Sequence, residues 1–514
     1  MKPFALLSVT DKSGLLDFAR GLVRRGYEIL STGGTGKFLA DNDVDYTGVS
    51  YYTGMPEILG GRVKTLHPKV HGGILARHES PEDQAVLEEL NIRPIRIVAV
   101  NLYPFEQTVL AGASREEIIE NIDIGGPAMI RAAAKNAETV LVVVDPNDYD
   151  DVLQFLDGGL GPEFREKLRA KAFAHTAYYD SLIAQFFSGG DPFAYDTVTV
   201  GYRKNAQLRY GENPHQRACL LQSPFDRTGV AHAEPLWGKE LSYNNLLDAD
   251  AAWNLVCDMK ALRPSLRACA IIKHSNPCGA AWCASLADAY QAAREADPIS
   301  AFGGIVALSD PVDEGAAAAM TAQGNFLEVV LAPDWSEGAL KVFQDRSGWG
   351  QSVRLLRARP PAEERPPSLR SIGGGALLQT EDANDPLEWT VVTERQPTEE
   401  EREAMRSAWV LVKHVRSNAI VLADSSRLWG VGAGQMNRVQ SVRLAIEQAG
   451  DRAAACALAS DAFLPFPDSI ETAAQAGIRA VIQPGGSKKD MEVIAAANAH
   501  SIAMVFTGVR HFRH

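Results

Sequence analysis

The chain has 514 residues, of which 46% are hydrophobic and 22% are charged, so it can bury a large core. Its formal net charge of -13 argues against nucleic acid as the main partner, and anionic substrates would need local basic pockets. The six cysteines are sparse and unevenly spaced, which indicates a reducing compartment rather than a disulfide framework. We find no signal peptide and no apolar run approaching the ~18 residues of a membrane span, so we expect a cytoplasmic protein that does not enter a membrane.

Buried strands alternate with amphipathic helices over the first 145 residues. Apolar residues recur at helical spacing from Leu15 to Val23, and Gly26 ends that predicted helix. A short helix is predicted to begin at Lys37, after a glycine-rich turn. The alternation predicts a mostly parallel sheet with helices on both faces. Strands are expected at residues 4–9, 27–30, 96–100 and 139–145.

Two breaks divide the rest of the chain. A helical, alanine-rich tract from residue 162 to about residue 187 ends at Gly189-Gly190-Asp191-Pro192, which indicates a boundary near residues 190–205. Four prolines among charged residues at 357–370 indicate an exposed connector. Mixed α/β patterns continue on both sides of the connector, and we find no convincing internal repeat in the sequence.

Two loops in the first 145 residues suit an anionic ligand. The first, Ser31-Thr32-Gly33-Gly34-Thr35-Gly36-Lys37, separates a strand from a helix, where small residues and free N–H groups can receive a phosphate. It is neither a Walker A loop nor a dinucleotide motif, and a plain tight turn would look the same. The second loop is Gly60-Gly61-Arg62-Val63-Lys64-Thr65-Leu66-His67-Pro68. It brings an Arg, a Lys and a His together, which suits an anionic ligand, and a merely solvated loop is the alternative.

A helix with Pro127 near its first turn follows the segment Asn121-Ile122-Asp123-Ile124-Gly125-Gly126. Arg131 and Lys135 lie one turn apart on the same face of this helix. A lysine in a partly desolvated site has a lowered pKa and can act as an acid or a base. An ordinary exposed helix lysine is the alternative interpretation.

The apolar run Ala270-Ile271-Ile272 predicts a buried strand that stops at Lys273-His274. We expect the Asn, Pro and Gly of the following Ser275-Asn276-Pro277-Cys278-Gly279 to force a turn, which would present the basic pair in a loop. His274 can exchange a proton near neutral pH, and Lys273 can stabilise an oxyanion beside it. Two solvated residues at the end of a strand are the alternative.

Two further patterns carry less weight. Gly432-Ala433-Gly434-Gln435-Met436-Asn437-Arg438 opens a helix but lacks the third glycine of a dinucleotide motif, so a nicotinamide dehydrogenase is not favoured, and failure to bind NAD would exclude it. His232-Ala233-Glu234 with Pro277-Cys278 is similar to the signature of zinc deaminases, but Ala281 stands where the next cysteine ligand belongs. We therefore predict no catalytic metal.

Taken together, these motifs resemble the AICAR transformylase / IMP cyclohydrolase family nearly from end to end. Further matching segments are Ser8-Val9-Thr10-Asp11-Lys12-Ser13-Gly14, Asn101-Leu102-Tyr103-Pro104-Phe105, Arg131-Ala132-Ala133-Ala134-Lys135-Asn136, Leu208-Arg209-Tyr210-Gly211-Glu212-Asn213-Pro214-His215-Gln216, Ser460-Asp461-Ala462-Phe463-Leu464-Pro465-Phe466 and Arg510-His511-Phe512-Arg513-His514. The resemblance implies an α/β protein: a methylglyoxal-synthase-like cyclohydrolase domain at residues 1–200, with its core at 1–145, and then two cytidine-deaminase-like transformylase subdomains at 201–365 and 366–514. It also implies a homodimer whose transformylase sites are shared between subunits.

The resemblance implies that the transformylase moves a formyl group from its co-substrate 10-formyltetrahydrofolate to the amine of AICAR. Because that amine is a poor nucleophile, the reaction needs a base and a cation for the oxyanion. His274 matches the base, Lys273 matches the group that stabilises the transition state, and Asn418 matches a further polar contributor. Nucleotide contacts are matched by Arg209, Tyr210, Gly303, Glu328 (an aspartate in some relatives), Arg438, Asp468 and Arg510, and folate contacts by Val439 and Phe463.

The cyclohydrolase would close formyl-AICAR to IMP with loss of water, a reaction that depends on positioning and proton transfer. The resemblance makes Lys135 the proton donor and acceptor, with Tyr103 and Asp123 as further catalytic groups. It assigns the phosphate cradle to Thr10, Asp11, Lys12, Thr32, Gly33, Gly34 and Thr35, and base and ribose contacts to Arg62, Val63, Lys64, Thr65, Asn101 and Ile124. A nucleotide- or phosphate-binding regulatory module is the alternative, and turnover of formyl-AICAR by the isolated first domain would decide between the two.

Overall fold

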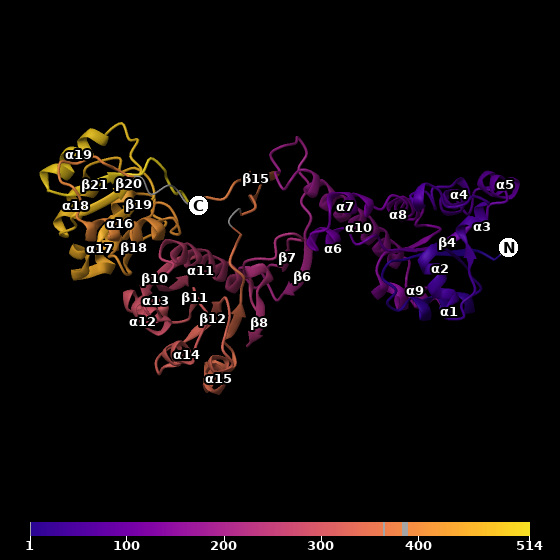
Figure 1. Cartoon of the computed structure of the whole chain (residues 1–514), viewed down its shortest axis with the longest axis horizontal. Helices are drawn as coiled ribbons and strands as arrows, with labels where there is room; N and C mark the ends of the chain where they lie inside the picture. Colours follow the sequence, from indigo (N-terminus) through magenta and orange to yellow (C-terminus); the bar gives the residue numbers. More distant parts are fainter. Residues whose placement is uncertain (1, 363–364, 383–388) are drawn as a thin grey trace. The chain divides into compact units, whose positions relative to one another are not determined.

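The chain forms two compact units, Met1–Tyr202 and Arg203–His514. The structure is a computed structural model that describes residues 2–362, 365–382 and 389–514. Both units combine sheets with helices (Figure 1), which confirms the predicted α/β class. Within the described residues, we find no helix with the length and apolar character needed to cross a membrane.

The first unit is built on a five-stranded parallel sheet in the order β3-β2-β1-β4-β5. The order reverses between β1 and β4, since β2 lies on one side of β1 and β4 on the other. Parallel sheets bind ligands at such a reversal, beyond the carboxyl ends of the strands. The strands are β1 (Phe4–Ser8), β2 (Glu28–Ser31), β3 (Thr47–Gly48), β4 (Ile95–Val100) and β5 (Leu141–Val143).

Helices connect these strands, and their apolar residues bury β1, β4 and β5 almost completely. The long helix predicted near residues 162–187 is confirmed as α10, which packs along α8 in the same unit (Figure 1). The helices are α1 (Leu15–Arg24), α2 (Gly33–Ala40), α3 (Val49–Thr53), α4 (Pro68–Leu75), α5 (Pro81–Glu89), α6 (Phe105–Leu110), α7 (Arg115–Glu120), α8 (Gly125–Lys135), α9 (Tyr149–Leu156) and α10 (Glu163–Phe187).

The prediction that a helix starts at Lys37 is wrong, because α2 already begins at Gly33. The glycine-rich segment is therefore the first turn of a helix and not a turn before it. Gly36 shows why glycine stands there: a Cβ atom at this position would lie 2.4 Å from Cε2 of Tyr46. Close packing, rather than a reversal of the chain, requires this glycine.

The second unit contains two six-stranded sheets with the same strand order. The sequence shows no convincing repeat, although the resemblance implied two subdomains of one fold. One sheet runs β10-β9-β11-β12-β13-β8 and the other β18-β17-β19-β20-β21-β16, with parallel and antiparallel neighbours at equivalent places. The first sheet comprises β8 (Glu234–Trp237), β9 (Arg267–Lys273), β10 (Asn276–Cys283), β11 (Gly304–Leu308), β12 (Leu327–Ala332) and β13 (Arg354–Arg357). The second comprises β16 (Thr390–Val391), β17 (Ile420–Ala423), β18 (Leu428–Gly432), β19 (Ala457–Ser460), β20 (Ala480–Gln483) and β21 (Ala503–Phe506).

One hydrophobic cluster joins the two sheets, since it contains residues of β9 and β11 as well as β17 and β19. Helices α11 and α16 contribute two large side chains to this cluster, Trp253 and Trp409, which are 1% exposed. The helices of this unit are α11 (Tyr243–Leu262), α12 (Leu286–Ala296), α13 (Pro298–Ala301), α14 (Glu314–Thr321), α15 (Glu337–Asp345), α16 (Glu399–Val412), α17 (Arg438–Ala449), α18 (Asp468–Gln475) and α19 (Asp490–Ala499). Two separate hairpins complete it: β6 (Arg203–Leu208) with β7 (Ala218–Gln222), and β14 (Ser368–Ile372) with β15 (Gly375–Gln379).

The strand predicted before Lys273-His274 is confirmed as β9, but the expected turn at Asn, Pro and Gly is wrong. Asn276 already pairs with Lys273 in the antiparallel ladder between β9 and β10, and Pro277 pairs with Ile272. His274 and Ser275 make the turn themselves, with φ angles of 53° and 61°. A two-residue hairpin turn with both residues in the left-handed region matches the right-handed twist of the strands.

Candidate active sites

A pocket of about 700 Å³ lies at the strand-order reversal of the first unit. Its walls come from the segments that follow β1, β2 and β4, from the basic loop of Arg62 and Lys64, and from the loop that precedes α8. The structure thus brings together most of the residues predicted for the cyclohydrolase. Those that line the pocket are Thr10, Lys12, Thr32, Gly33, Gly34, Thr35, Arg62, Lys64, Thr65, Asn101, Tyr103, Asp123 and Ile124.

The segments after β1 and β2 form one wall of this pocket, and hydrogen bonds hold them together. The Thr35 hydroxyl accepts the Val9 N–H at 3.0 Å and donates to the Val9 carbonyl oxygen at 3.0 Å. The Ser8 and Thr32 hydroxyls lie 2.8 Å apart, and Asn101 accepts the Thr10 N–H at 2.5 Å. Thr32 is the N-cap residue of α2, and its hydroxyl makes no capping hydrogen bond to the helix. Gly33 and Gly34 in the first turn of α2 line the pocket, as does Lys12. This wall suits a phosphate.

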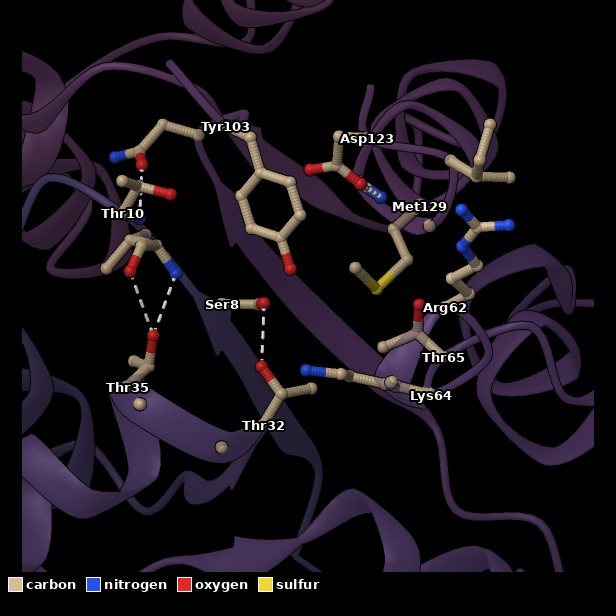
Figure 2. A pocket seen from close by; sticks show the side chains of 18 of the residues that line it. Ser8, Thr10, Thr32, Thr35, Arg62, Lys64, Thr65, Tyr103, Asp123 and Met129 are labelled. Atoms are coloured by element: carbon tan, nitrogen blue, oxygen red, sulfur yellow. Dashed lines mark hydrogen bonds between the residues drawn. The ribbon is translucent and has the colours of Figure 1, made fainter. Parts of the chain in front are cut away.

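The basic loop forms the opposite wall. Figure 2 shows the Lys64 ammonium and the Tyr103 hydroxyl pointing into the same cavity. Lys64 lies 3.4 Å from the Glu57 carboxylate, and Arg62 forms an ion pair with Glu120 at the rim. The cations of this loop are therefore held by acids that line or border the pocket, which keeps them in place for an anionic ligand.

Asp123 is the acid of the pocket whose pKa is raised. Burial raises the pKa of its carboxyl group, although the Gly126 N–H donates to it at 2.7 Å and the Lys64 ammonium acts in the opposite direction. Tyr179 on α10 holds the backbone here: its hydroxyl accepts the Asp123 N–H at 2.8 Å and donates to the Asn121 carbonyl oxygen at 3.1 Å. A carboxyl group with a raised pKa is suited to proton transfer near neutral pH.

Lys135 does not line this pocket. It occupies the last turn of α8, whereas Asp123 precedes the first turn, and a helix of this length rises by about 15 Å. Lys135 instead lines a separate hollow of about 450 Å³ together with His71, Arg131 and Phe173. Burial lowers the pKa of His71, and the Arg131 guanidinium lies 5.7 Å from the centroid of the Phe173 ring. The structure of one chain therefore separates Lys135 from Tyr103 and Asp123.

In the second unit, the β9–β10 hairpin presents Lys273 and His274 together. His274 is exposed at the tip, and Lys273 is held because its ammonium donates to the Phe302 carbonyl oxygen at 2.8 Å. Gly303, a predicted nucleotide contact, follows directly: a Cβ atom there would lie 3.6 Å from Lys273 Nζ. Lys273 and Gly303, both predicted for the transformylase site, are therefore neighbours in the structure.

Asn276 joins this hairpin to the loop that carries Asn418. Its amide donates to the His274 carbonyl oxygen at 3.1 Å, and its Oδ1 accepts the Arg416 N–H at 3.1 Å. Asn418 lies two residues further on, and its amide group donates to the Gln435 carbonyl oxygen at 2.9 Å. The structure thus brings His274 and Asn418, from different sheets of this unit, to the same region.

Arg438 lies beneath Asn418 and is 8% exposed. Its guanidinium donates to Oδ1 of Asn418 at 2.8 Å and to the Ser460 hydroxyl at 2.9 Å, and it forms a buried ion pair with Asp461. The guanidinium of Arg438 therefore binds side chains of the protein, and one of these bonds orients the amide of Asn418. Its predicted contact with the nucleotide stays a prediction.

The remaining predicted residues of the transformylase have contacts of their own. Glu328 pairs with Arg354 at 2.7 Å, and the Arg209 guanidinium lies 5.6 Å from the centroid of the Tyr210 ring. Asp468 is the first residue of α18, Val439 is the second residue of α17, Phe463 is 40% exposed, and the Arg510 guanidinium lies 4.7 Å from the centroid of the Phe512 ring. In the first unit, Asp11 and Val63 stand beside lining residues, and the Asp11 carboxylate accepts the Ser13 N–H at 2.9 Å.

Two supporting residues were missed from the sequence. Tyr179 lies within a helix of the first unit, and Asp248 lies within α11, far along the chain from the groups they contact. Neither stands in a motif, so the sequence offers no signal for them.

The described part of the chain contains no group of three or more His, Cys, Asp or Glu side chains that could hold a metal ion.

Comparison with known proteins places both halves of the chain. The profile of the AICARFT/IMPCHase bienzyme matches residues 133–448, and that of the MGS-like domain matches residues 14–128. The chain is 50% identical to the bifunctional purine biosynthesis protein PurH of Halalkalibacterium halodurans, over 100% of both chains. It is 51% identical to the PurH of Myxococcus xanthus, over 99% of this chain and 100% of that protein. A solved structure described as the crystal structure of ForH is 40% identical over 36% of this chain and 97% of that chain, with a TM-score of 0.32.

Proposed function

Because the chain belongs to the AICARFT/IMPCHase bienzyme family, we propose that its two units divide the two reactions of that family between them. The chain is a bifunctional enzyme of purine biosynthesis. It transfers a formyl group to AICAR and then closes formyl-AICAR to IMP with loss of water. The first unit would carry the ring closure and the second the formyl transfer. The pocket at the strand-order reversal supports this division, since it is built from first-unit residues alone.

In the proposed transformylase site, His274 accepts a proton from the amine of AICAR as the amine attacks the formyl carbon. The Lys273 ammonium stabilises the oxyanion that forms there. When the oxyanion collapses, the bond between the formyl carbon and N10 of the folate breaks. N10 takes up the proton that His274 accepted, and tetrahydrofolate leaves. Asn418 supplies a further polar contact from the facing loop, in an orientation fixed by Arg438 and Gln435. The formyl donor is 10-formyltetrahydrofolate, with Val439 and Phe463 as its contacts. The remaining nucleotide contacts are those predicted from the sequence.

In the proposed cyclohydrolase site, the carboxamide nitrogen of formyl-AICAR attacks its formyl carbon, and the formyl oxygen leaves as water. The nitrogen loses protons and the oxygen gains them, so a nearby group must move protons in both directions. Asp123 suits this role because its pKa is raised and it borders the pocket. Tyr103 and Lys64 face the same space. Lys135 is a proposed contributor by resemblance only.

Two full-length variants test the division of labour. His274→Ala should abolish most formyl transfer while still converting supplied formyl-AICAR to IMP. Asp123→Asn should show the reverse pattern, so that formyl-AICAR accumulates from AICAR. Equal damage to both activities by either substitution, in a protein with an unchanged melting profile, would contradict the proposal.

The family's homodimer and a cytoplasmic location complete the proposal. The absence of any requirement for metal is part of it, and chelator-treated enzyme should keep both activities. Loss of either activity on chelation, with recovery on adding zinc, would overturn that part.

A further inference from the structure

We propose that Asp248 on α11 is a positioning residue that holds the proposed base His274 in place, an inference that rests on the proposed function of His274. The Asp248 carboxylate accepts the His274 N–H at 3.2 Å through Oδ2 and the Ser275 N–H at 2.7 Å through Oδ1. Oδ1 also accepts the Ser275 hydroxyl at 3.3 Å. Both oxygens of one side chain thus bind the two residues at the hairpin tip.

The tip needs such support because its backbone is unusual for its sequence. Hairpin turns with both central residues in the left-handed region normally contain asparagine and glycine, whereas this one contains histidine and serine. A side chain with a Cβ atom is disfavoured in this region, so the conformation persists only where the surroundings impose it. A carboxylate that accepts both N–H groups supplies charge-assisted hydrogen bonds specific to this conformation.

Asp248 is itself fixed by a rigid element. It lies in the second turn of α11, between a capping box at Ser242 and the buried residues Ala249 and Ala252. Through Asp248, the hairpin tip is therefore attached to a helix that packs in the core of the unit. Asn276 makes a second attachment, because it binds both the His274 carbonyl oxygen and the loop that carries Asn418. The position of His274 relative to Asn418 therefore depends on Asp248 and on Asn276.

The described contacts of Asp248 are to the backbone of His274 and to Ser275, not to the imidazole. Among the contacts described for the tip, the charged side chains are Asp248 on α11, which binds it, and Lys273 on β9, which directly precedes it. A positioning role predicts that loss of Asp248 lowers the rate of proton transfer and leaves its pH midpoint in place. An electrostatic role would instead move the midpoint.

The test uses full-length Asp248→Asn and Asp248→Ala, with AICAR and 10-formyltetrahydrofolate as substrates. Asn keeps one acceptor oxygen and the shape of the side chain, so we expect transformylase kcat to fall about 10-fold, and about 10²-fold for Ala. KM for AICAR, the pH midpoint and the cyclohydrolase activity should stay unchanged. Asp313→Asn is the matched control, because Asp313 also accepts a backbone N–H, that of Ala316 at 2.7 Å, at the start of α14.

A double variant separates this inference from the proposed function. In the His274→Ala background, Asp248→Asn should cause no further loss, because it acts through the residue already removed. Unchanged kcat in Asp248→Asn, a full additional loss in the double variant, or a shifted pH midpoint would each overturn the inference while leaving His274 as the base. Full activity of His274→Ala alone would instead refute the proposed function. If Asp248→Ala fails to fold, Asp248→Asn decides the question.

Discussion

Replacing Tyr179 with phenylalanine isolates one hydroxyl that holds the loop of Asp123. Tyr179 is 6% exposed, and burial raises its pKa to about 12, so the hydroxyl stays protonated at working pH and can both donate and accept. Tyr179→Phe removes the bonds to the Asp123 N–H and the Asn121 carbonyl oxygen but keeps the ring that packs edge-on against Phe105.

Two hydrogen bonds of this kind contribute about 2 kcal/mol together. For a unit of this size, that loss corresponds to a decrease in melting temperature of about 4–8 °C. Because the loop also places the Asp123 carboxyl group at the pocket, we expect cyclohydrolase kcat to fall about 10-fold, with formyl transfer unchanged. The measurements are thermal melting and the conversion of supplied formyl-AICAR to IMP.

Tyr178→Phe is the control on the same helix. The Tyr178 hydroxyl donates at 3.0 Å to the carboxylate of Glu106 on α6, and not to the loop of Asp123. We expect this variant to lose some stability and to keep its cyclohydrolase rate. If both variants lose cyclohydrolase activity in proportion to their loss of stability, the positioning of Asp123 by Tyr179 is refuted.

Three further predictions follow from the same geometry. Because Lys135 lies at the far end of α8, Lys135→Ala should lower cyclohydrolase kcat less than Asp123→Asn does, and the opposite ranking would show that one chain's pocket is incomplete. Since burial raises the pKa of Asp123, the folded state holds this proton more tightly than the unfolded chain, and the resulting stability is lost as pH rises through the folded pKa. Asp123→Asn should therefore have a higher melting temperature than the parent at pH 7, and this difference should shrink in acid. A difference that does not change with pH would show that the pKa of Asp123 is not raised by folding. Gly279→Ala would place a Cβ atom 2.0 Å from the Ala293 carbonyl oxygen, so we expect a loss of about 1–3 kcal/mol in a denaturant melt, whereas Gly373→Ala, which meets nothing within 4 Å, should be neutral.

Some features of the fold could be read from the sequence because they depend on neighbours along the chain. The apolar runs of β1, β4 and β9 and the helical periodicity of α10 were predicted close to their observed bounds. Glycine was harder to interpret. The glycines before Lys37 were predicted to form a turn, but they belong to the first turns of α2. Gly36 is needed there because it packs closely against Tyr46.

The hairpin at His274 shows the same limit more sharply. Asn, Pro and Gly are the usual signals of a turn, so the turn was expected at residues 276–279. Pairing with β9 instead draws Asn276 and Pro277 into β10, and His274 and Ser275 take the left-handed conformation under contact with Asp248. Local preference was overridden by ladder pairing and by a carboxylate on a helix distant in the sequence.

The sequence by itself determined the alternation of elements, the types of chemical group available and the family they resemble, because each is encoded in residue order and spacing. Only the tertiary structure decided which groups meet. It gathered the segments after β1, β2 and β4 around Asp123, placed Lys135 at the other end of α8, and brought Asn418 from one sheet to His274 from the other. These outcomes depend on contacts between residues far apart in the chain, and no local pattern specifies such contacts.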